Sequence, residues 1–77
     1  MNNDQIKEII FKTGLRQWEI AAQMGTDETY LCRLFRKPLN DSNKARIISA
    51  IRTLLIERKN EIEKIIKNME ETNNESN

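Results

Sequence analysis

Two arginine residues, Arg33 and Arg36, have the side-chain type and spacing that best suit a chemical task in this 77-residue chain. A guanidinium group can donate two hydrogen bonds to the N7 and O6 atoms of one guanine, or it can neutralise a phosphate. Residues three apart lie on one face of a helix, so both groups would project from the same surface. A charged helical face is usually only solvated, however, and the surrounding sequence must therefore indicate whether this face contacts a second molecule.

The chain offers no arrangement of residues for catalysis or metal binding. It contains no histidine, one cysteine, and neither paired carboxylates nor a glycine-rich phosphate loop. A thiol without a partner fits a reducing compartment, and no apolar run approaches the roughly 20 residues of a membrane span. The N-terminal residues also lack the basic and hydrophobic regions of an export signal. We therefore expect a cytoplasmic protein that is not an enzyme, with no cofactor, no metal and no small-molecule substrate.

The basic residues are concentrated in the central part of the chain, although the formal net charge is only +1. Residues 12–52 contain eight basic and four acidic side chains, whereas residues 57–77 contain four basic and six acidic ones. A basic region beside an acidic one is the asymmetry expected when only one face of a protein meets phosphates. The excess is small, so it supports a nucleic-acid partner only in combination with a binding motif.

Residues 17–36 predict two short helices joined by a tight turn. Apolar residues recur at helical spacing on both sides of the turn: Ile20, Ala21, Met24, Leu31, Leu34 and Phe35. Ala21 is small, as required where crossing helices approach to about 8–10 Å. Gly25 can end the first helix in a left-handed conformation, and Thr26 or Asp27 can cap the second. The small residue, the glycine and the cap together define a helix-turn-helix.

This segment resembles the motif of helix-turn-helix transcriptional repressors of the phage repressor and Cro type, also called the XRE type. Seven residues match the family's pattern of glutamine, aliphatic, alanine and glycine positions: Gln17, Ile20, Ala21, Met24, Gly25, Leu31 and Leu34. Two positions depart, because Thr26 replaces an aliphatic residue and Arg16 replaces the usual Ser or Thr cap. Glu19 can compensate for the missing Ser or Thr cap by accepting a hydrogen bond from a free backbone N–H. The resemblance covers about residues 4–56 and implies that the partner is double-stranded DNA.

The helix predicted over about residues 27–36 would then be the recognition helix in the major groove. Its outward face carries the candidate contacts to bases: Glu28, Thr29, Cys32, Arg33 and Arg36. A carboxylate near DNA must accept from a cytosine amino group or be held by a neighbour, and the resemblance suggests Gln17 as the neighbour of Glu28. The candidate contacts to phosphates are Gln17, Lys37, Lys44 and Arg46.

Further helices are expected on either side of the motif. Three residues can cap a first helix, which should end near Thr13: Asn2, Asn3 and Asp4. Pro38 prevents the recognition helix from continuing, and two residues can cap the next helix: Asp41 and Ser42. Trp18 allows two interpretations, since it can lie partly over the core with its N–H outward or contact a phosphate. We expect an all-α fold of four to five helices with a long C-terminal helix.

That C-terminal helix is predicted from residue 43 to about residue 70, with no glycine or proline to interrupt it. Apolar residues recur every seven positions along it, and Arg58 interrupts the stripe. A small domain cannot cover the whole stripe, so a homodimer interface is expected at Leu55, Ile62, Ile65, Ile66 and Met69. The alternative is a break near Lys59 or Asn60 that folds the last segment back. The predicted organisation is a DNA-binding domain over residues 1–56, a helical extension over 57–70 and a disordered tail over 71–77.

The function implied by the resemblance is sequence-specific DNA binding by a dimeric regulator, most simply a repressor from a phage, plasmid or other mobile element that binds a palindromic operator. Two alternatives remain open. The first is an architectural or excisionase-like factor that bends DNA and binds direct repeats. The second is a protein-interaction module that uses the isoleucine-rich C-terminal helix and has no salt-sensitive affinity for DNA.

Overall fold

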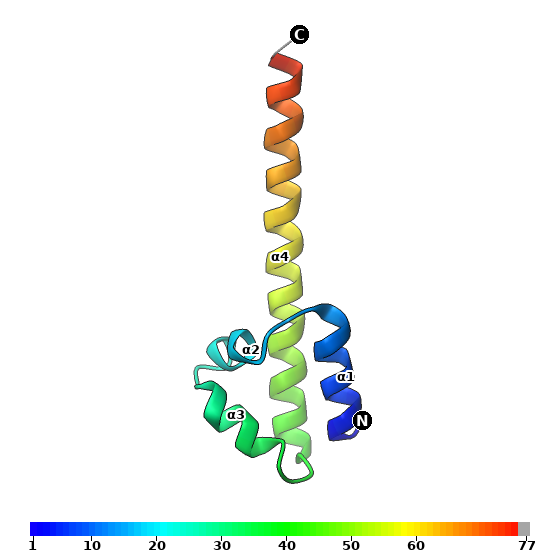
Figure 1. Ribbon diagram of the computed structural model, residues 1–77, viewed down its shortest axis with the longest axis vertical. Coiled ribbons are helices and arrows are strands. Elements are labelled where there is room, and N and C mark those ends of the chain that lie inside the picture. Colours follow the sequence, from blue (N-terminus) through cyan, green and yellow to red (C-terminus); the bar gives the residue numbers. More distant parts are fainter. Residues whose placement is uncertain (76–77) are drawn as a thin grey trace.

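A computed structural model describes the backbone of residues 1–75 and the side chains of residues 1–71. These residues form α1 (Asn3–Thr13), α2 (Gln17–Gln23), α3 (Glu28–Leu34) and α4 (Asp41–Glu75), with no strand in the described part of the chain. In Figure 1 the three short helices surround the first half of α4, and the second half of α4 projects away from them. The predicted all-α fold with a long C-terminal helix is confirmed.

The beginning and end of α1 follow from local side-chain chemistry. The Asn2 Oδ1 atom accepts from the backbone N–H of Gln5 at 2.9 Å, and the Asn2 backbone N–H donates to Gln5 Oε1 at 2.8 Å. These two bonds satisfy donors that a helix N-terminus would otherwise leave free. The helix ends at Thr13 because Gly14 adopts a left-handed conformation with φ of 73°.

The fourth helix differs from the sequence prediction at both ends. Its N-cap is Asn40, whose Oδ1 accepts from the Asn43 backbone N–H at 2.8 Å, and neither Asp41 nor Ser42 has this role. An asparagine side chain reaches the free N–H groups as well as an aspartate does, so the helix begins at Asp41, and both residues expected to cap it lie within its first turn. The helix then continues to Glu75, because no glycine or proline stops it. Residues 71–75 are thus helical, in contrast to the predicted disordered tail, and residues 76–77 lie outside the described residues.

The core lies between the three short helices and the first half of α4. Four side chains, one from each helix, are almost completely buried: Ile6, Ile20, Leu31 and Ile47. Leu15 and Leu39, which lie in the connections between helices, are also buried and close the core at its edges. Each aliphatic side chain of this size contributes about 1.5–3 kcal/mol when fully buried. The core therefore fixes the orientation of α2 and α3 against α4.

The second half of α4 lies outside this core. A helix of 35 residues extends about 52 Å at 1.5 Å per residue, which accounts for most of the 58 Å length of the molecule. No helix among the described residues is both long enough and apolar enough to cross a membrane.

Candidate nucleic-acid interface

The turn between α2 and α3 is closed by backbone hydrogen bonds that depend on Gly25. The Thr26 N–H donates to the Ala21 carbonyl at 2.9 Å, and the Gly25 N–H donates to the Ala22 carbonyl at 3.0 Å. This pair of bonds is a Schellman motif, which needs a left-handed residue at the position of Gly25. The φ angle of Gly25 is 77°, and the space where a Cβ atom would lie is open. The glycine is therefore required by its backbone conformation and not by crowding.

The small residue expected at the helix crossing is buried. Ala21 is 1% exposed and belongs to the same core cluster as Ile20 and Leu31, which are the most deeply buried residues of α2 and α3. A larger side chain at Ala21 would displace one helix from the other, since the core around it is closed. The helix-turn-helix geometry predicted from residues 17–36 is thus present.

A cap and an amphipathic pattern set the start and the orientation of α3. The Asp27 Oδ1 atom accepts from the Tyr30 backbone N–H at 2.8 Å. Of the two residues expected to cap α3, Thr26 and Asp27, it is therefore Asp27 that does so. Leu31 and Phe35 are buried, and Leu34 is partly buried. The opposite face is exposed and carries four of the five side chains expected to contact bases: Glu28, Thr29, Cys32 and Arg33. The fifth, Arg36, is also exposed but follows the helix.

Arg36 does not lie within α3, although the sequence placed it there. The helix ends at Leu34, Phe35 is its C-cap, and the Arg36 N–H bonds to the Arg33 carbonyl at 3.1 Å in the turn that follows. The burial of Phe35 explains this early end, because the chain must turn toward Pro38 and the buried Leu39. Arg36 is therefore carried by the connection between α3 and α4.

Gln17 contacts a different partner from the one suggested by the resemblance. Its Oε1 atom lies 3.4 Å from the Cys32 Sγ atom and accepts a hydrogen bond from the thiol. Among the described residues, no hydrogen bond joins Gln17 to Glu28. Cys32 is exposed and Gln17 is partly buried, so the contact links the start of α2 to the exposed face of α3.

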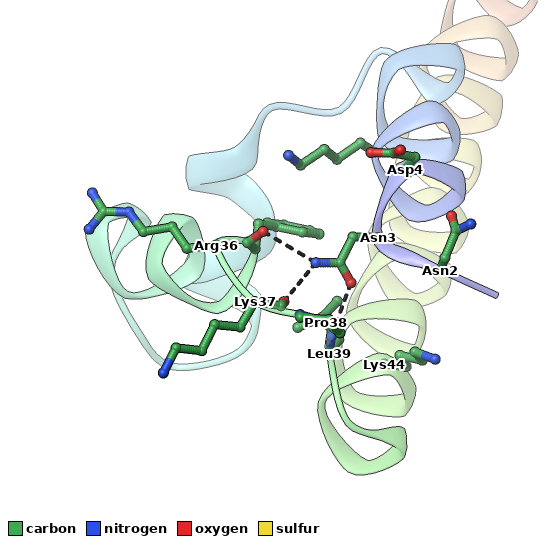
Figure 2. A pocket seen from close by; sticks show the side chains of 10 residues that line it. Asn2, Asn3, Asp4, Arg36, Lys37, Pro38, Leu39 and Lys44 are labelled. Carbon is green, nitrogen blue, oxygen red and sulfur yellow. Dashed lines mark hydrogen bonds between the residues drawn. The ribbon is translucent and has the colours of Figure 1, made fainter.

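The expected phosphate contacts fall into two groups. Lys37 and Lys44 line one hollow of about 360 Å³ together with Arg36, whereas Arg46 lines a separate hollow beside Gln23. Figure 2 shows that the Arg36 and Lys37 side chains extend away from that of Lys44. The structure therefore places Arg36 and Lys37 just after α3, while Lys44 and Arg46 lie on different sides of α4.

Two residues near this face were not found by the sequence analysis. Tyr30 is 37% exposed on α3, three residues before Arg33, and its hydroxyl can act as donor or acceptor. Lys7 comes from α1, and its Nζ atom lies 5.4 Å from the centre of the Phe35 ring. Tyr30 could have been found from its helical spacing, whereas no local signal connects Lys7 to Phe35, since 28 positions of the sequence separate them.

Trp18 and Glu19 lie at the start of α2, on the side that faces α4. Trp18 is 59% exposed and lies beside Ala22 and Leu54, so the core covers less than half of it. Glu19 Oε2 accepts from the Arg16 backbone N–H at 2.7 Å, as predicted for the missing Ser or Thr cap. The other oxygen of Glu19 lies 2.8 Å from Arg58 Nη2, a pairing that no local pattern indicated.

The side chains expected to form a dimer interface are exposed in the single chain. Ile62, Ile65 and Ile66 are each 49% exposed, and Met69 is 64% exposed. Leu55 differs, because it is partly buried and packs against the core. The α4 helix passes through residues 59 and 60 without a break, so the alternative in which the last segment folds back is wrong.

Comparisons with protein-family models, with curated proteins and with solved structures gave no match to this chain. Inference of a function therefore rests on the geometry of α2 and α3 and on the resemblance carried by residues 17–34.

Proposed function

We propose that this protein is a sequence-specific DNA-binding regulator of transcription, acting in the cytoplasm as a dimeric repressor of the kind carried by phages, plasmids and other mobile elements. The observation that carries the proposal is the exposed polar face of α3, held on α2 by the Gly25 turn and the buried Ala21. A helix supported in this way can enter the major groove, where base edges differ between all four base pairs.

Direct reading of bases is assigned to the exposed side chains of α3. Arg33 can donate two hydrogen bonds to one guanine, which discriminates against other bases by about 1–3 kcal/mol. Thr29 can contact a thymine methyl group, and Glu28 can accept from a cytosine amino group. Cys32 lies between them on the same face, with its thiol directed to Gln17. These residues supply hydrogen-bond groups of both kinds, as sequence recognition requires.

Contacts to the DNA backbone are assigned to the residues around this face. Arg36 and Lys37 lie just after the end of α3. Both side chains are positively charged, so the phosphates of DNA attract them. Lys44, Arg46 and the N-terminal turn of α2 at Gln17 lie farther from the bases. Such contacts fix the register of the protein on the duplex without reading its sequence.

The second copy of the chain is expected to bind along the exposed stripe of α4, which consists of Ile62, Ile65, Ile66 and Met69. Covering the exposed half of each side chain contributes about 1 kcal/mol per residue, since full burial of such side chains contributes about 1.5–3 kcal/mol. A two-fold dimer places its recognition helices in successive major grooves about 34 Å apart. The operator is therefore expected to be a near-palindrome, and bound protein would block RNA polymerase.

Selection of bound sites from random double-stranded DNA at physiological salt tests this proposal. We expect the full chain to select a near-palindrome, and Arg33→Ala to lose discrimination at one position of each half-site. Lys64→Ala is the matched control, because it also removes one cation but lies on the exposed second half of α4. Failure of the unaltered chain to select any sequence, or equal losses in Arg33→Ala and Lys64→Ala, would contradict the assignment.

The exposed stripe of α4 also favours a second candidate function, that of a protein-interaction module. In that case the stripe binds another regulator, and the α3 face has no role. Affinity for DNA separates the two, because binding driven by phosphates falls steeply as the salt concentration rises. A footprint over direct repeats, in place of one inverted repeat, would instead indicate the architectural alternative.

A further inference from the structure

The side chain of Asn3 joins the start of α1 to the connection between α3 and α4. Its Nδ2 atom donates to the Phe35 carbonyl at 3.2 Å and to the Lys37 carbonyl at 2.8 Å. Its Oδ1 atom accepts from the Leu39 backbone N–H at 3.0 Å. Figure 2 shows all three bonds converging on this one amide group. Asn2 caps α1, so the amide of Asn3 is free to make these contacts.

The chemistry of the three bonds matches an asparagine side chain closely. A primary amide has two N–H donors and one carbonyl acceptor, which is the set needed for two backbone carbonyls and one N–H. Backbone groups that follow a helix end have no partner within the helix, and leaving them unbonded is unfavourable where they are partly buried, as the Phe35 carbonyl and the Leu39 N–H are. An aspartate has the same shape but offers no donor to the carbonyls of Phe35 and Lys37.

The bonds made by Asn3 lie on both sides of Arg36. The carbonyls of Phe35 and Lys37 are those of its two neighbours in the chain, and the ring of Phe35 is also buried below Lys7. These carbonyls belong to the Phe35–Arg36 and Lys37–Pro38 peptide groups, so holding both of them restricts the backbone of Arg36 and Lys37, which lie between them. The directions of the Arg36 and Lys37 side chains are therefore set in part by a residue of α1.

We propose that Asn3 is a positioning residue for DNA recognition, which holds Arg36 and Lys37 in place beside the recognition helix. The inference rests on the proposed function in so far as these two cations contact DNA. It extends that function to α1, which carries none of the proposed contacts to bases. Asn3 itself does not touch the nucleic acid in this arrangement.

Amide hydrogen exchange of the full chain tests the bonds without DNA. In Asn3→Ala the Leu39 N–H loses its acceptor, and we expect its exchange to accelerate at least about tenfold, while the N–H groups of Leu31 and Ile47 keep their protection. Asn2→Ala is the matched control, because it removes the α1 cap and Asn2 takes no part in the three bonds of Asn3. Equal acceleration at Leu39 in both variants would overturn the inference.

Affinity for the selected operator tests the positioning role. Asn3→Ala should weaken binding about five- to tenfold, as expected when a hydrogen-bonding network worth about 1 kcal/mol is lost. The loss should be much smaller in an Arg36→Ala, Lys37→Ala background, since the residues that Asn3 positions are then absent. In an Arg33→Ala background the loss should remain full.

Asn3→Asp separates positioning from a structural role in α1. An acidic residue in the first turn of a helix is favourable, so a role limited to helix stability predicts no loss of operator affinity. A positioning role, in contrast, predicts that removal of both donors in Asn3→Asp weakens operator binding at least as much as Asn3→Ala does.

If the unaltered chain selects no DNA, the proposed function fails and the DNA role of Asn3 fails with it. If it binds DNA but Asn3→Asp and Asn3→Ala bind as well as the unaltered chain does, only the inference about Asn3 is overturned.

Discussion

The two halves of α4 carry the same apolar periodicity, but they differ in what covers it. In the first half Ile47 and Ile51 are 0% and 3% exposed, because α1, α2 and α3 pack around them. In the second half Ile62 and Ile65 continue the same stripe and are each 49% exposed. A helical stripe of isoleucines therefore specifies a face to be buried without specifying the partner that covers it. The first half finds its partner within the chain, and we assign the second half to another copy.

The largest expected effect comes from matched substitutions in the two halves. Ile47→Ala should lower the free energy of unfolding by about 2–5 kcal/mol, because it leaves a cavity in a closed core. Ile65→Ala removes a half-exposed side chain and should change the stability of the isolated domain much less. Urea unfolding followed by circular dichroism, at a concentration where the protein is monomeric, measures both values. Similar losses in the two variants would remove the distinction between the halves.

The second-largest expected effect is on dimerisation through the second half of α4. Ile62→Asp combined with Ile65→Asp places two negative charges per chain in the proposed dimer interface. This pair should weaken dimerisation at least about a hundredfold, because a buried charge without a partner is strongly unfavourable. The helical content of the domain should stay almost unchanged. Sedimentation velocity measures the oligomeric state, and Lys64→Asp combined with Lys67→Asp serves as the control on another face of the same helix. A dimer that survives the first pair but not the second would place the interface elsewhere.

A smaller effect is expected from the turn that holds α2 and α3 against the first half of α4. Gly25→Ala should cost about 1–2 kcal/mol, because a left-handed conformation is unfavourable for a residue with a Cβ atom. Since the surrounding space is open, no further cost from steric overlap is expected. Thermal unfolding should record the loss, and the association measured by sedimentation should not change. A loss of dimer in this variant would mean that the two halves of α4 are coupled.

The smallest effect concerns the boundary between the halves, where Arg58 is paired with Glu19. Glu19→Gln keeps an oxygen for the Arg16 N–H but removes the charge, and should cost less than about 1 kcal/mol for a pair that is partly exposed. Glu63→Gln is the matched control, since its contact with Lys59 is 4.0 Å long and both side chains are largely exposed. We expect no measurable change in that control by urea unfolding. A loss above about 2 kcal/mol in Glu19→Gln would indicate that the pair holds α2 on α4.

Much of the fold and of the candidate interface could be predicted because the signals are local. Helical spacing of apolar residues indicated which face of α3 is buried, and Gly25 indicated the turn. Asp27 and Glu19 bond to backbone groups three residues away, so their roles could be inferred from spacing alone. The ends of α4 and the end of α3 were predicted less well, since several polar residues can cap a helix and tertiary contacts choose among them.

The sequence by itself determined the helices, the turn between α2 and α3, and the polar face that we assign to DNA, because each depends on contacts within about four residues. Only the tertiary structure decided that Asn3 holds the residues on either side of Arg36 and that Arg58 pairs with Glu19. These contacts join residues 32 to 39 positions apart, and a periodic pattern carries no information about which distant side chains will meet. The packing of the core brings them together, since it fixes α1 and α4 around α3.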